Sequence, residues 1–296
     1  MSQASEKEDD SDSINWFVEI RGLALMLLAV LAFHSLIAKP FYIPSTSMMP
    51  NLLVGDRLVV TKYPYGWSWV SASFHVLPRG TWRIMPATPE YGDIVVPVPP
   101  GSDEDYIKRV VALPGDRIAV IDGQIVLNGE PVPQEVVPAV QISAEDSHHC
   151  NGSDCLSNYE QFRTRLPNGR QVYEIPTYRE TLPNGASYLI FDYEDQILDN
   201  MSEIAVPAGH VFVMGDNRDD SADSRASEAE RGLDGPIPLE NIGGRAEFIT
   251  FSLDGSTTWN PATWWQSLRE GRAWTTLRPT VDSQISGSGT ADDDNQ

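Results

Sequence analysis

The pattern of apolar and polar positions divides the chain into one continuous apolar stretch near its start and a long body of short β-type runs. Residues 22–38 carry no charged side chain and are flanked by Arg21 and Lys39. At 1.5 Å per residue, this stretch is at the short end of what crosses roughly 30 Å of hydrocarbon. Adding residues 14–20 gives a full span. We therefore predict a transmembrane anchor over residues 14–38.

Two other interpretations of the apolar stretch are a cleaved signal peptide and a buried helix. A signal peptide begins with basic residues and ends at a small-residue cleavage site, whereas this chain begins with acidic residues. The anchor is therefore favoured. Its orientation stays open, because Lys7 and Arg21 lie on one side and Lys39 on the other, so the positive-inside rule barely decides.

The body that follows is predicted to be β-structure almost throughout. Its apolar runs are short, rich in β-branched residues and separated by Gly and Pro. Asp122-Gly123, inside one of them, predicts a tight hairpin. Since strands do not alternate with helices, a parallel Rossmann-like sheet is excluded. The runs are 57–63, 93–98, 106–113, 118–127, 187–193, 210–214 and 245–252.

The charge balance of the chain limits the classes of macromolecule that it is expected to bind. The chain has 42 acidic and 21 basic residues among 296, and a phosphate backbone needs a basic surface. We therefore expect no nucleic-acid partner.

Lysine is scarce, which draws attention to Lys108. Only four of the 21 basic residues are lysines, and arginine, unlike lysine, cannot lose its proton. In a strand, Lys108 shares a face with Tyr106 and Val110, so its amine could lie among apolar side chains. A general base needs its pKa lowered from about 10.4 to about 7–8. On this segment alone, an exposed lysine on an edge strand is the simpler interpretation.

Ser45 and Ser47 follow the apolar stretch and lie between Pro44 and Pro50. Prolines are expected to hold this segment extended and to present a hydroxyl rigidly. Taken alone, the segment could be an ordinary Ser/Thr-rich loop. It has neither a Gly-x-Ser-x-Gly elbow nor a lysine three residues after Ser47, which disfavours the hydrolase-elbow and penicillin-binding classes.

A Ser-His-Asp triad is disfavoured because no histidine has an acidic partner in a recognisable motif. A dense polar cluster, residues 215–225, follows an apolar run and could be a solvated turn or part of a site. The five histidines are His34, His75, His148, His149 and His210.

Cys150 and Cys155 are separated by four residues and preceded by His148 and His149. A disulfide is favoured over zinc, because a pair this close resembles a loop staple more than zinc-finger spacing. A reduced, idle pair is the third alternative. We predict no other metal ligands and no cofactor.

Four blocks occur together and in a fixed order. They are Ile43-Pro-Ser-Thr-Ser-Met-Met-Pro50, Gly92-Asp-Ile-Val-Val96, Tyr106-Ile-Lys-Arg-Val-Val-Ala-Leu-Pro-Gly-Asp116 and Gly215-Asp-Asn-Arg-Asp-Asp-Ser-Ala-Asp-Ser-Arg225. Together they closely resemble bacterial type I signal peptidase over roughly residues 20–252. Any one of these motifs alone would be weak, but all four in order are specific.

The resemblance implies a Ser/Lys-dyad endopeptidase with Ser47 as nucleophile and Lys108 as general base. Ser45 matches an oxyanion-hole hydroxyl, and Ser221 matches the hydroxyl that orients the lysine. Supporting positions are Asp223 and Arg225. The walls of small S1 and S3 pockets, which in the family accept Ala-x-Ala, are matched by Phe41, Ile43, Pro44, Tyr106 and Ile107.

The resemblance further implies a mainly β fold, in which an N-terminal transmembrane helix precedes two intergrown antiparallel β-sheet domains. The single anchor puts the N-terminus in the cytoplasm and the body on the outer face of the cytoplasmic membrane. Signal-peptide-bearing preproteins and the lipid bilayer are the expected partners of a monomer. Predicted parts are a disordered tail (1–13), the anchor (14–38), a catalytic β domain (39–128 and 206–252), an inserted β and loop domain (129–205), a tryptophan-rich segment (253–281) and a disordered tail (282–296).

The chain departs from the family pattern after Arg225, where an aromatic-Gly pair and Val-Pro are usual and residues 226–238 differ. Thr46 also replaces a common glycine. Two alternative functions are a self-cleaving repressor-type protease, which would carry a DNA-binding helix-turn-helix, and an inactive membrane-anchored scaffold. Tryptophan favours the membrane–water interface, so we expect a loop over 65–88 with Trp67, Trp69, Phe74 and Trp82 to contact the bilayer.

Overall fold

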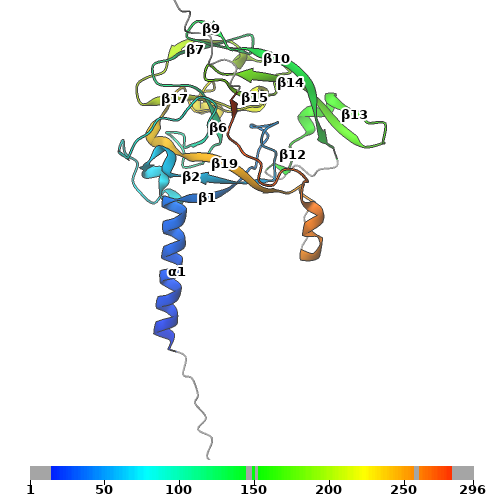
Figure 1. Cartoon of the computed structure of the whole chain (residues 1–296). Helices are drawn as coiled ribbons and strands as arrows, with labels where there is room; N and C mark the ends of the chain where they lie inside the picture. Colours follow the sequence, from blue (N-terminus) through cyan, green and yellow to red (C-terminus); the bar gives the residue numbers. More distant parts are fainter. Residues whose placement is uncertain (1–14, 145–148, 151–152, 257–259, 282–296) are drawn as a thin grey trace, which may run out of the picture.

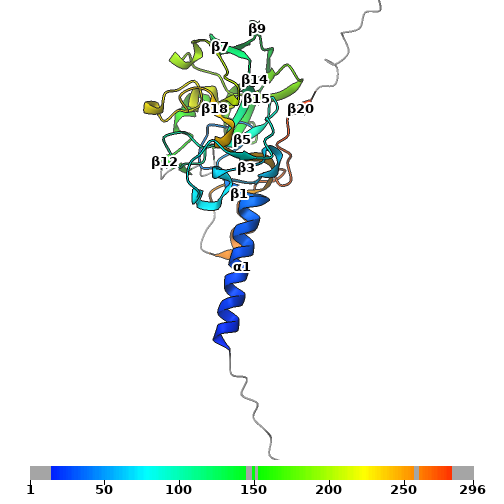
Figure 2. The same cartoon turned by 90° about the vertical axis from the view of Figure 1, so that its left-hand side faces the viewer.

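The computed structural model describes residues 15–144, 149–150, 153–256 and 260–281. Within them the chain is mainly β, and every pair of named strands is antiparallel. One long helix, α1 (Trp16–Leu36), projects from the β body (Figures 1 and 2). The predicted mainly β fold with an N-terminal apolar helix is confirmed.

The apolar helix has no buried side chain and a mean hydropathy of 2.0, so by length and composition it can cross a membrane. Asn15 caps its first turn by accepting a hydrogen bond from the Val18 N–H. Its last turn is fixed to the body, because Trp67 Nε1 donates to the Leu36 carbonyl at 2.8 Å. The N–H of Ser73 also donates to Ser35 Oγ at 3.0 Å.

The largest sheet has seven strands and receives the chain directly from α1. Its order is β1 (Ala38–Tyr42), β2 (Asp56–Thr61), β19 (Ile242–Ser252), β5 (Ile94–Pro97), β6 (Lys108–Ala112), β17 (His210–Met214) and β18 (Ile237–Pro238). Strands from the first and the last parts of the β body therefore lie side by side in one sheet. The predicted runs 57–63, 93–98, 106–113, 210–214 and 245–252 all supply strands to it.

A four-stranded sheet contains the predicted hairpin. Its order is β16 (Met201–Ala205), β7 (Arg117–Ile121), β8 (Gln124–Leu127) and β9 (Glu130–Pro131). Asp122 and Gly123 both adopt positive φ, at 48° and 79°, as a two-residue turn requires. This sheet joins strands from both sides of the predicted boundary between residues 128 and 129.

The remaining strands form a five-stranded sheet and two short ribbons. The sheet contains β10 (Gln134–Ser143), β14 (Gln171–Thr181), β15 (Ala186–Ile190), β20 (Thr280–Val281) and, beside β14, β13 (Arg163–Arg165). The ribbons are β3 (Trp67–Ser68) with β4 (Arg83–Ile84), and β11 (His149–Cys150) with β12 (Ser153–Asp154). Short 3-10 turns are η1 (Tyr63–Tyr65), η2 (Trp69–Ser71), η3 (Ser73–His75), η4 (Ser157–Phe162), η5 (Ile197–Asp199), η6 (Arg218–Asp220), η7 (Glu228–Glu230), η8 (Leu239–Asn241) and η9 (Pro261–Ser267).

The tryptophan prediction is wrong for one residue. Trp69 is only 2% exposed, because its ring packs against His75 and Arg79 and its Nε1 donates to Asn241 Oδ1. Phe74 is 84% exposed and Trp82 is exposed as well. Exposed Trp265 belongs to the C-terminal segment, while Trp259 lies outside the described residues.

Candidate active site

Ser47 lies in a tight turn between β1 and β2. Its neighbours Met48 and Met49 are fully buried in two different core clusters. The Met49 N–H donates to the Thr46 carbonyl at 3.0 Å, so the backbone turns at the serine. The predicted extended conformation is therefore wrong from Thr46 onward: burying successive methionines in separate clusters requires a turn, which also holds Ser47 in place.

Lys108 begins β6, which lies between β5 and β17 in the interior of the seven-stranded sheet. Its side chain is 4% exposed. The interpretation as an exposed edge-strand lysine is therefore wrong, because hydrogen-bonded neighbours flank the strand on both sides.

The serine and the lysine meet although 61 residues separate them in the chain. Lys108 Nζ lies 3.0 Å from Ser47 Oγ and donates to the Ile107 carbonyl at 3.0 Å. Burial lowers the pKa of Lys108 to about 8, although the carboxylates of Asp223, Asp216 and Asp220 oppose this shift. A substantial fraction of the amine is thus neutral near pH 8 and can accept a proton from the hydroxyl.

Ser45 lies beside Ser47, and its Oγ is 3.3 Å from Ser47 Oγ. Ser221 is buried, and its Oγ has no hydrogen-bond partner among the described residues. A Cβ added to Gly215 would collide with both Ser221 Oγ and the Ser47 carbonyl, so the absence of a side chain at this position lets Ser221 and Ser47 approach the same face of the glycine. Whether Ser221 orients the lysine stays a prediction.

Asp223 and Arg225 form an ion pair behind the site, with Oδ2 and Nη2 3.0 Å apart and both side chains buried. Asp223 also accepts from the Gly215 N–H at 3.0 Å. These bonds, together with the positive charge of Arg225, keep the pKa of Asp223 below its ordinary value despite burial. The pair therefore fixes the loop that carries Ser221 to the end of β17.

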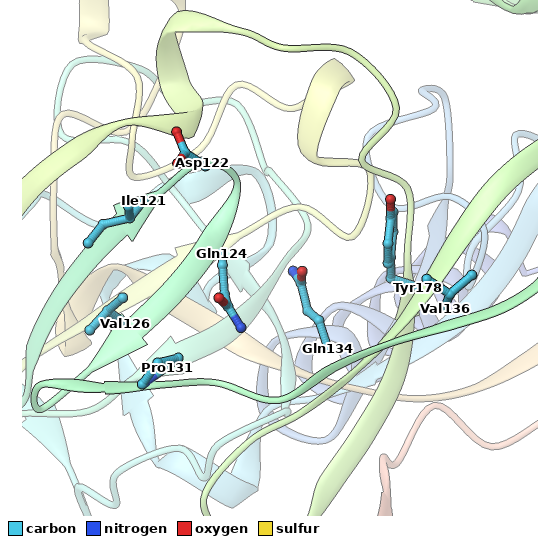
Figure 3. Close-up of a pocket in the computed structure, with 8 residues that line it drawn as sticks. All are labelled: Ile121, Asp122, Gln124, Val126, Pro131, Gln134, Val136 and Tyr178. Atoms are coloured by element: carbon cyan, nitrogen blue, oxygen red, sulfur yellow. The ribbon is translucent and has the colours of Figure 1, made fainter.

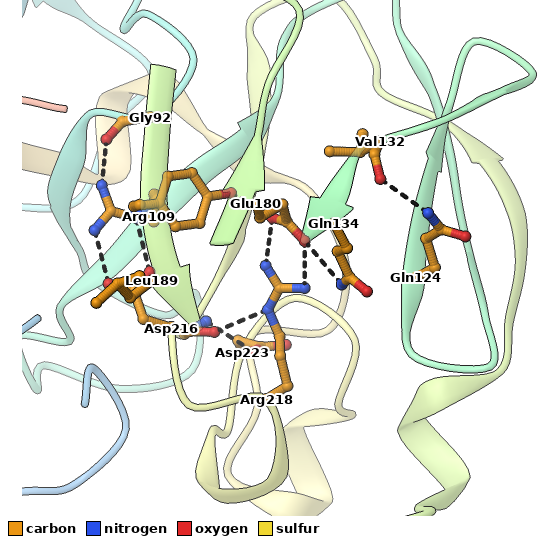
Figure 4. A network of polar contacts seen from close by, with 12 residues as sticks. Gly92, Arg109, Gln124, Val132, Gln134, Glu180, Leu189, Asp216, Arg218 and Asp223 are labelled. Atoms are coloured by element: carbon orange, nitrogen blue, oxygen red, sulfur yellow. Dashed lines mark hydrogen bonds and ion pairs between the residues drawn. The ribbon is translucent and has the colours of Figure 1, made fainter. Parts of the chain in front are cut away.

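Two further buried ion pairs join the polar cluster to neighbouring sheets (Figure 4). Arg109 binds Asp216 through two hydrogen bonds of 2.7 Å, and Arg218 binds Glu180 at 2.6 and 3.0 Å. Paired charges of this kind tolerate burial because each hydrogen-bonds the other. Sequence reasoning noted the density of polar residues over 215–225 but found neither partner.

Two contacts fix the serine segment directly to the same cluster. Thr46 Oγ1 donates to Asp220, and the Asn217 N–H donates to the Ser47 carbonyl at 3.2 Å. The Thr46 contact shows what the hydroxyl does at the position where glycine is common. Neither contact was predicted, since nothing in the sequence pairs positions 46–47 with 217–220.

A cleft of about 620 Å³ opens onto the dyad. It is lined by Pro44, Ser45, Ser47, Glu104, Asp105, Tyr106, Ile107, Lys108, Asp220, Ala222, Glu230 and Arg231. Of the predicted pocket residues, Phe41 and Ile43 do not line it. Ile43 is 1% exposed and belongs to the core cluster against which Phe41 packs.

The divergent segment after Arg225 forms one wall of this cleft. The Tyr106 hydroxyl donates to the Arg231 carbonyl at 3.0 Å, and the Leu233 N–H donates to the Asp223 carbonyl at 3.0 Å. The segment is thus attached both to the ion pair behind the site and to the strand that carries the lysine.

A second hollow, of about 460 Å³, lies between the β7–β8 hairpin and the β10–β14 pair (Figure 3). Gln124, Gln134 and Tyr178 line it, together with mostly apolar neighbours, and neither dyad residue does. It contains no arrangement of a nucleophile and a base.

The structure bears on two alternatives from the sequence, a histidine as the general base and a zinc ion at the cysteines. His75 Nε2 lies 3.2 Å from Asp105 Oδ1, but no hydrogen bond links it to a hydroxyl of the described residues. Cys155 is disulfide-bonded, which does not fit its use as a zinc ligand. The side chains of His149 and Cys150, and the whole of His148, lie outside what the structure describes.

Comparison with known proteins gives one family. The model of the family "Signal peptidase, peptidase S26" matches residues 14–251. Signal peptidase I of Rickettsia bellii (strain OSU 85-389) is 33% identical over 251 residues, covering 84% of this chain and 75% of the relative. Signal peptidase I of Rickettsia canadensis (strain McKiel) is 34% identical over 260 residues, covering 84% and 82%. The enzyme of the same name from Rickettsia akari (strain Hartford) is 35% identical over 231 residues, covering 77% of each chain.

Proposed function

The chain belongs to the signal peptidase family, peptidase S26, and on that premise we propose that it removes signal peptides from exported preproteins with a Ser47/Lys108 dyad. The observation that carries the proposal is the 3.0 Å contact between Ser47 Oγ and Lys108 Nζ at the floor of an open cleft. Both groups are present and adjacent, which argues against an inactive scaffold. The family match also leaves the self-cleaving repressor without support.

In the first step, neutral Lys108 takes the proton of Ser47 while Oγ attacks the scissile carbonyl carbon. The resulting lysine ammonium then gives this proton to the leaving amine as the C–N bond breaks, which leaves an ester on Ser47. In the second step, Lys108 takes a proton from water, whose oxygen attacks the ester carbonyl. Collapse returns the proton to Ser47 Oγ and releases the new carboxyl end.

The negative charge that develops on the carbonyl oxygen needs donors. Ser45 Oγ and the Ser47 N–H are proposed to supply them, since Ser45 Oγ already lies 3.3 Å from the nucleophile. Donors fixed in advance around a developing oxyanion contribute about 2.7–4 kcal/mol each in hydrolases. In the free enzyme the Ser45 hydroxyl contacts Ser47 Oγ, and during turnover it would donate to the substrate oxygen instead.

Selection of small side chains, as in Ala-x-Ala, is proposed to arise at the end of the cleft between Pro44, Tyr106 and Ile107. An extended substrate can gain main-chain hydrogen bonds along the strand edges on either side of the dyad. The Ile43 N–H is not available for this, because it donates to the Asp56 carbonyl at 3.0 Å. Main-chain hydrogen bonding between the substrate and the serine-bearing segment is therefore expected to start at Ser45.

We also propose that α1 crosses the cytoplasmic membrane once, with the N-terminus in the cytoplasm and the monomeric body on the outer face. The outer face is oxidising in many bacteria, and a Cys150–Cys155 disulfide is consistent with it. Right-side-out vesicles of cells test the orientation: external protease should digest the body and leave the N-terminal tail protected. Protection of the body instead would contradict this topology.

The function is tested with the full chain in detergent and a preprotein bearing an Ala-x-Ala cleavage site. The expected product is the mature protein, with its new N-terminus immediately after the second alanine. A substrate with Phe in place of that alanine is the matched control and should remain uncut. Cleavage of both substrates would contradict the pocket assignment, and cleavage of neither by wild type would contradict the function.

A further inference from the structure

Three carboxylates outside the dyad come together from two separate segments. Asp192 follows β15, Asp199 ends η5 and Asp219 lies in η6, and a carboxylate oxygen of each lies within 4.8 Å of the others. The segments are fixed side by side, because the Arg218 N–H donates to the Phe191 carbonyl at 2.8 Å. Sequence analysis included Asp219 only within the block 215–225 and named neither Asp192 nor Asp199, because the fold alone brings the three together.

In two of these carboxylates, a backbone N–H donates a hydrogen bond to one oxygen and the second oxygen receives none. Asp199 Oδ2 accepts from the Gln196 N–H at 2.6 Å, and Asp219 Oδ2 accepts from the Tyr193 N–H at 2.7 Å. Oδ1 of Asp199 and Oδ1 of Asp219 are both buried and have no hydrogen-bond partner among the described residues. Asp199 as a whole is only 5% exposed. Two fixed, buried oxygens therefore lack a partner.

The third side of the cluster is closed by the β7–β8 turn. The Gly123 N–H donates to the Asp199 carbonyl at 3.0 Å, and a Cβ at Gly123 would collide with Asp192 Oδ2. The glycine therefore allows the turn to approach both aspartates closely. The cluster therefore packs against the β7–β8 turn, with Asp199 buried and Asp192 and Asp219 partly exposed.

None of the three aspartates forms an ion pair with a described residue, and Arg218, the nearest basic influence on Asp192, already binds Glu180 (Figure 4). A buried carboxylate such as that of Asp199 is costly without a counter-charge.

We propose that Asp192, Asp199 and Asp219 bind one Ca²⁺ ion. All three ligands are hard oxygens, with no nitrogen or sulfur in the set, which suits Ca²⁺ or Mg²⁺. Ca²⁺ is the better fit because it accepts irregular carboxylate geometry, whereas Mg²⁺ demands a near-ideal octahedron. The ion joins the segment after β15 to η6, which leads into Asp220 and Ser221.

The test is calorimetric titration of CaCl₂ into the full chain in detergent, stripped with EDTA, at pH 8 and 150 mM NaCl. The salt suppresses diffuse binding to this acidic protein. One saturable site per chain is expected, and its occupation at a hundredfold excess over Kd should raise Tm by about 5 °C or more. MgCl₂ at the same concentrations should bind more weakly. Both readouts are independent of peptidase activity.

Asp199→Asn and Asp219→Asn should each lose the site and the Tm shift, and Asp192→Asn, at a less buried position, should weaken binding at least tenfold. Asp195→Asn is the matched control, since this exposed aspartate lies in the same segment. Wild-type protein that shows neither binding nor a Tm shift overturns the proposal, whatever the variants do. So does Ca²⁺ binding that survives in all three variants, or a site that prefers Mg²⁺.

Discussion

Two buried lysines in this chain have similarly lowered pKa values but different neighbours. Lys62, at the end of β2, is 3% exposed, and Lys108 is 4% exposed. Burial is the main cause that lowers the pKa of each to about 8. Lys108 Nζ lies 3.0 Å from Ser47 Oγ, whereas no hydrogen bond joins Lys62 Nζ to a hydroxyl of the described residues. Desolvation therefore makes a lysine able to act as a base, and only the neighbouring hydroxyl gives it a reaction.

The largest expected difference between the two is in turnover. Ser47→Ala and Lys108→Met should each lower preprotein cleavage about 10³-fold or more, because nucleophile and base act as a unit. Lys108→Arg should fail equally, since arginine does not lose its proton. Lys62→Met should stay within about threefold of wild type. Initial rates of preprotein cleavage measure all four, and a comparable loss in Lys62→Met would remove the distinction.

The next effect concerns the developing oxyanion. Ser45→Ala should lower kcat by about 10²–10³-fold, corresponding to the loss of one donor, and leave KM nearly unchanged. Ser202→Ala, in exposed β16, is the control and should have no effect. Steady-state kinetics separate the two constants. A raised KM with kcat intact would instead identify Ser45 as a residue of the substrate pocket.

The two lysines should contribute alike to the pH dependence of stability. Each has a folded pKa of about 8, below its unfolded value of about 10.4, so the unfolded chain holds more protons between these limits. Stability should rise with pH from about 8 to 10.4, and below pH 8 each buried lysine costs about 3 kcal/mol. Lys62→Met and Lys108→Met should each flatten this rise. Thermal unfolding at pH 7 and pH 10 checks it, and variants that keep the wild-type slope would argue against a neutral buried amine.

The pH–rate profile should separate the lysines again. For wild type, kcat/KM should increase tenfold per pH unit up to about 8 and then level off, as Lys108 deprotonates. Lys62→Met should retain this midpoint. A midpoint near 6.5 would indicate a histidine as the base.

The smallest effect is expected from Ser221, which is buried beside the site and whose hydroxyl has no hydrogen-bond partner within the described part of the chain. If it orients the lysine during turnover, Ser221→Ala should shift the midpoint of the pH–rate profile by a fraction of a unit and lower kcat. Ser221→Thr, which keeps the hydroxyl, should restore the midpoint. An unchanged profile in Ser221→Ala would leave the residue with a packing role alone.

How far the sequence predicted the structure depended on how local each signal was. The Asp122-Gly123 turn and β17 were found from a few adjacent residues. β10 and β14 were missed within a segment described as loop-rich, because Pro138 and Pro176 interrupt them. The register of this pair shifts between Val137 and Val140, so both prolines lie at a bulge, where a missing N–H is tolerated.

For the site, the family motifs identified Ser47 and Lys108, and their contact could not be predicted from either segment alone. The burial of Lys108 depends on β5 and β17, which pair with its strand on opposite sides in the sheet, and β17 comes from about a hundred residues later in the chain. The same holds for Glu180, which binds Arg218 from another sheet, and for the Thr46–Asp220 bond. Such contacts follow from topology and leave no pattern of their own in the sequence.

The attachment of α1 to the body has a consequence for which peptide bonds can be cut. Ten residues, 37–46, separate the helix from Ser47, and the hydrogen bonds of Leu36 and Ser35 with the β3 region leave this connection little freedom to stretch. Once α1 lies in the bilayer, the height of the Ser47 hydroxyl above the membrane surface is fixed by the fold. With the proposed function and topology, we therefore expect the enzyme to select by distance as well as by side-chain size: of several Ala-x-Ala sites in one preprotein, the one at the matching height should be cut.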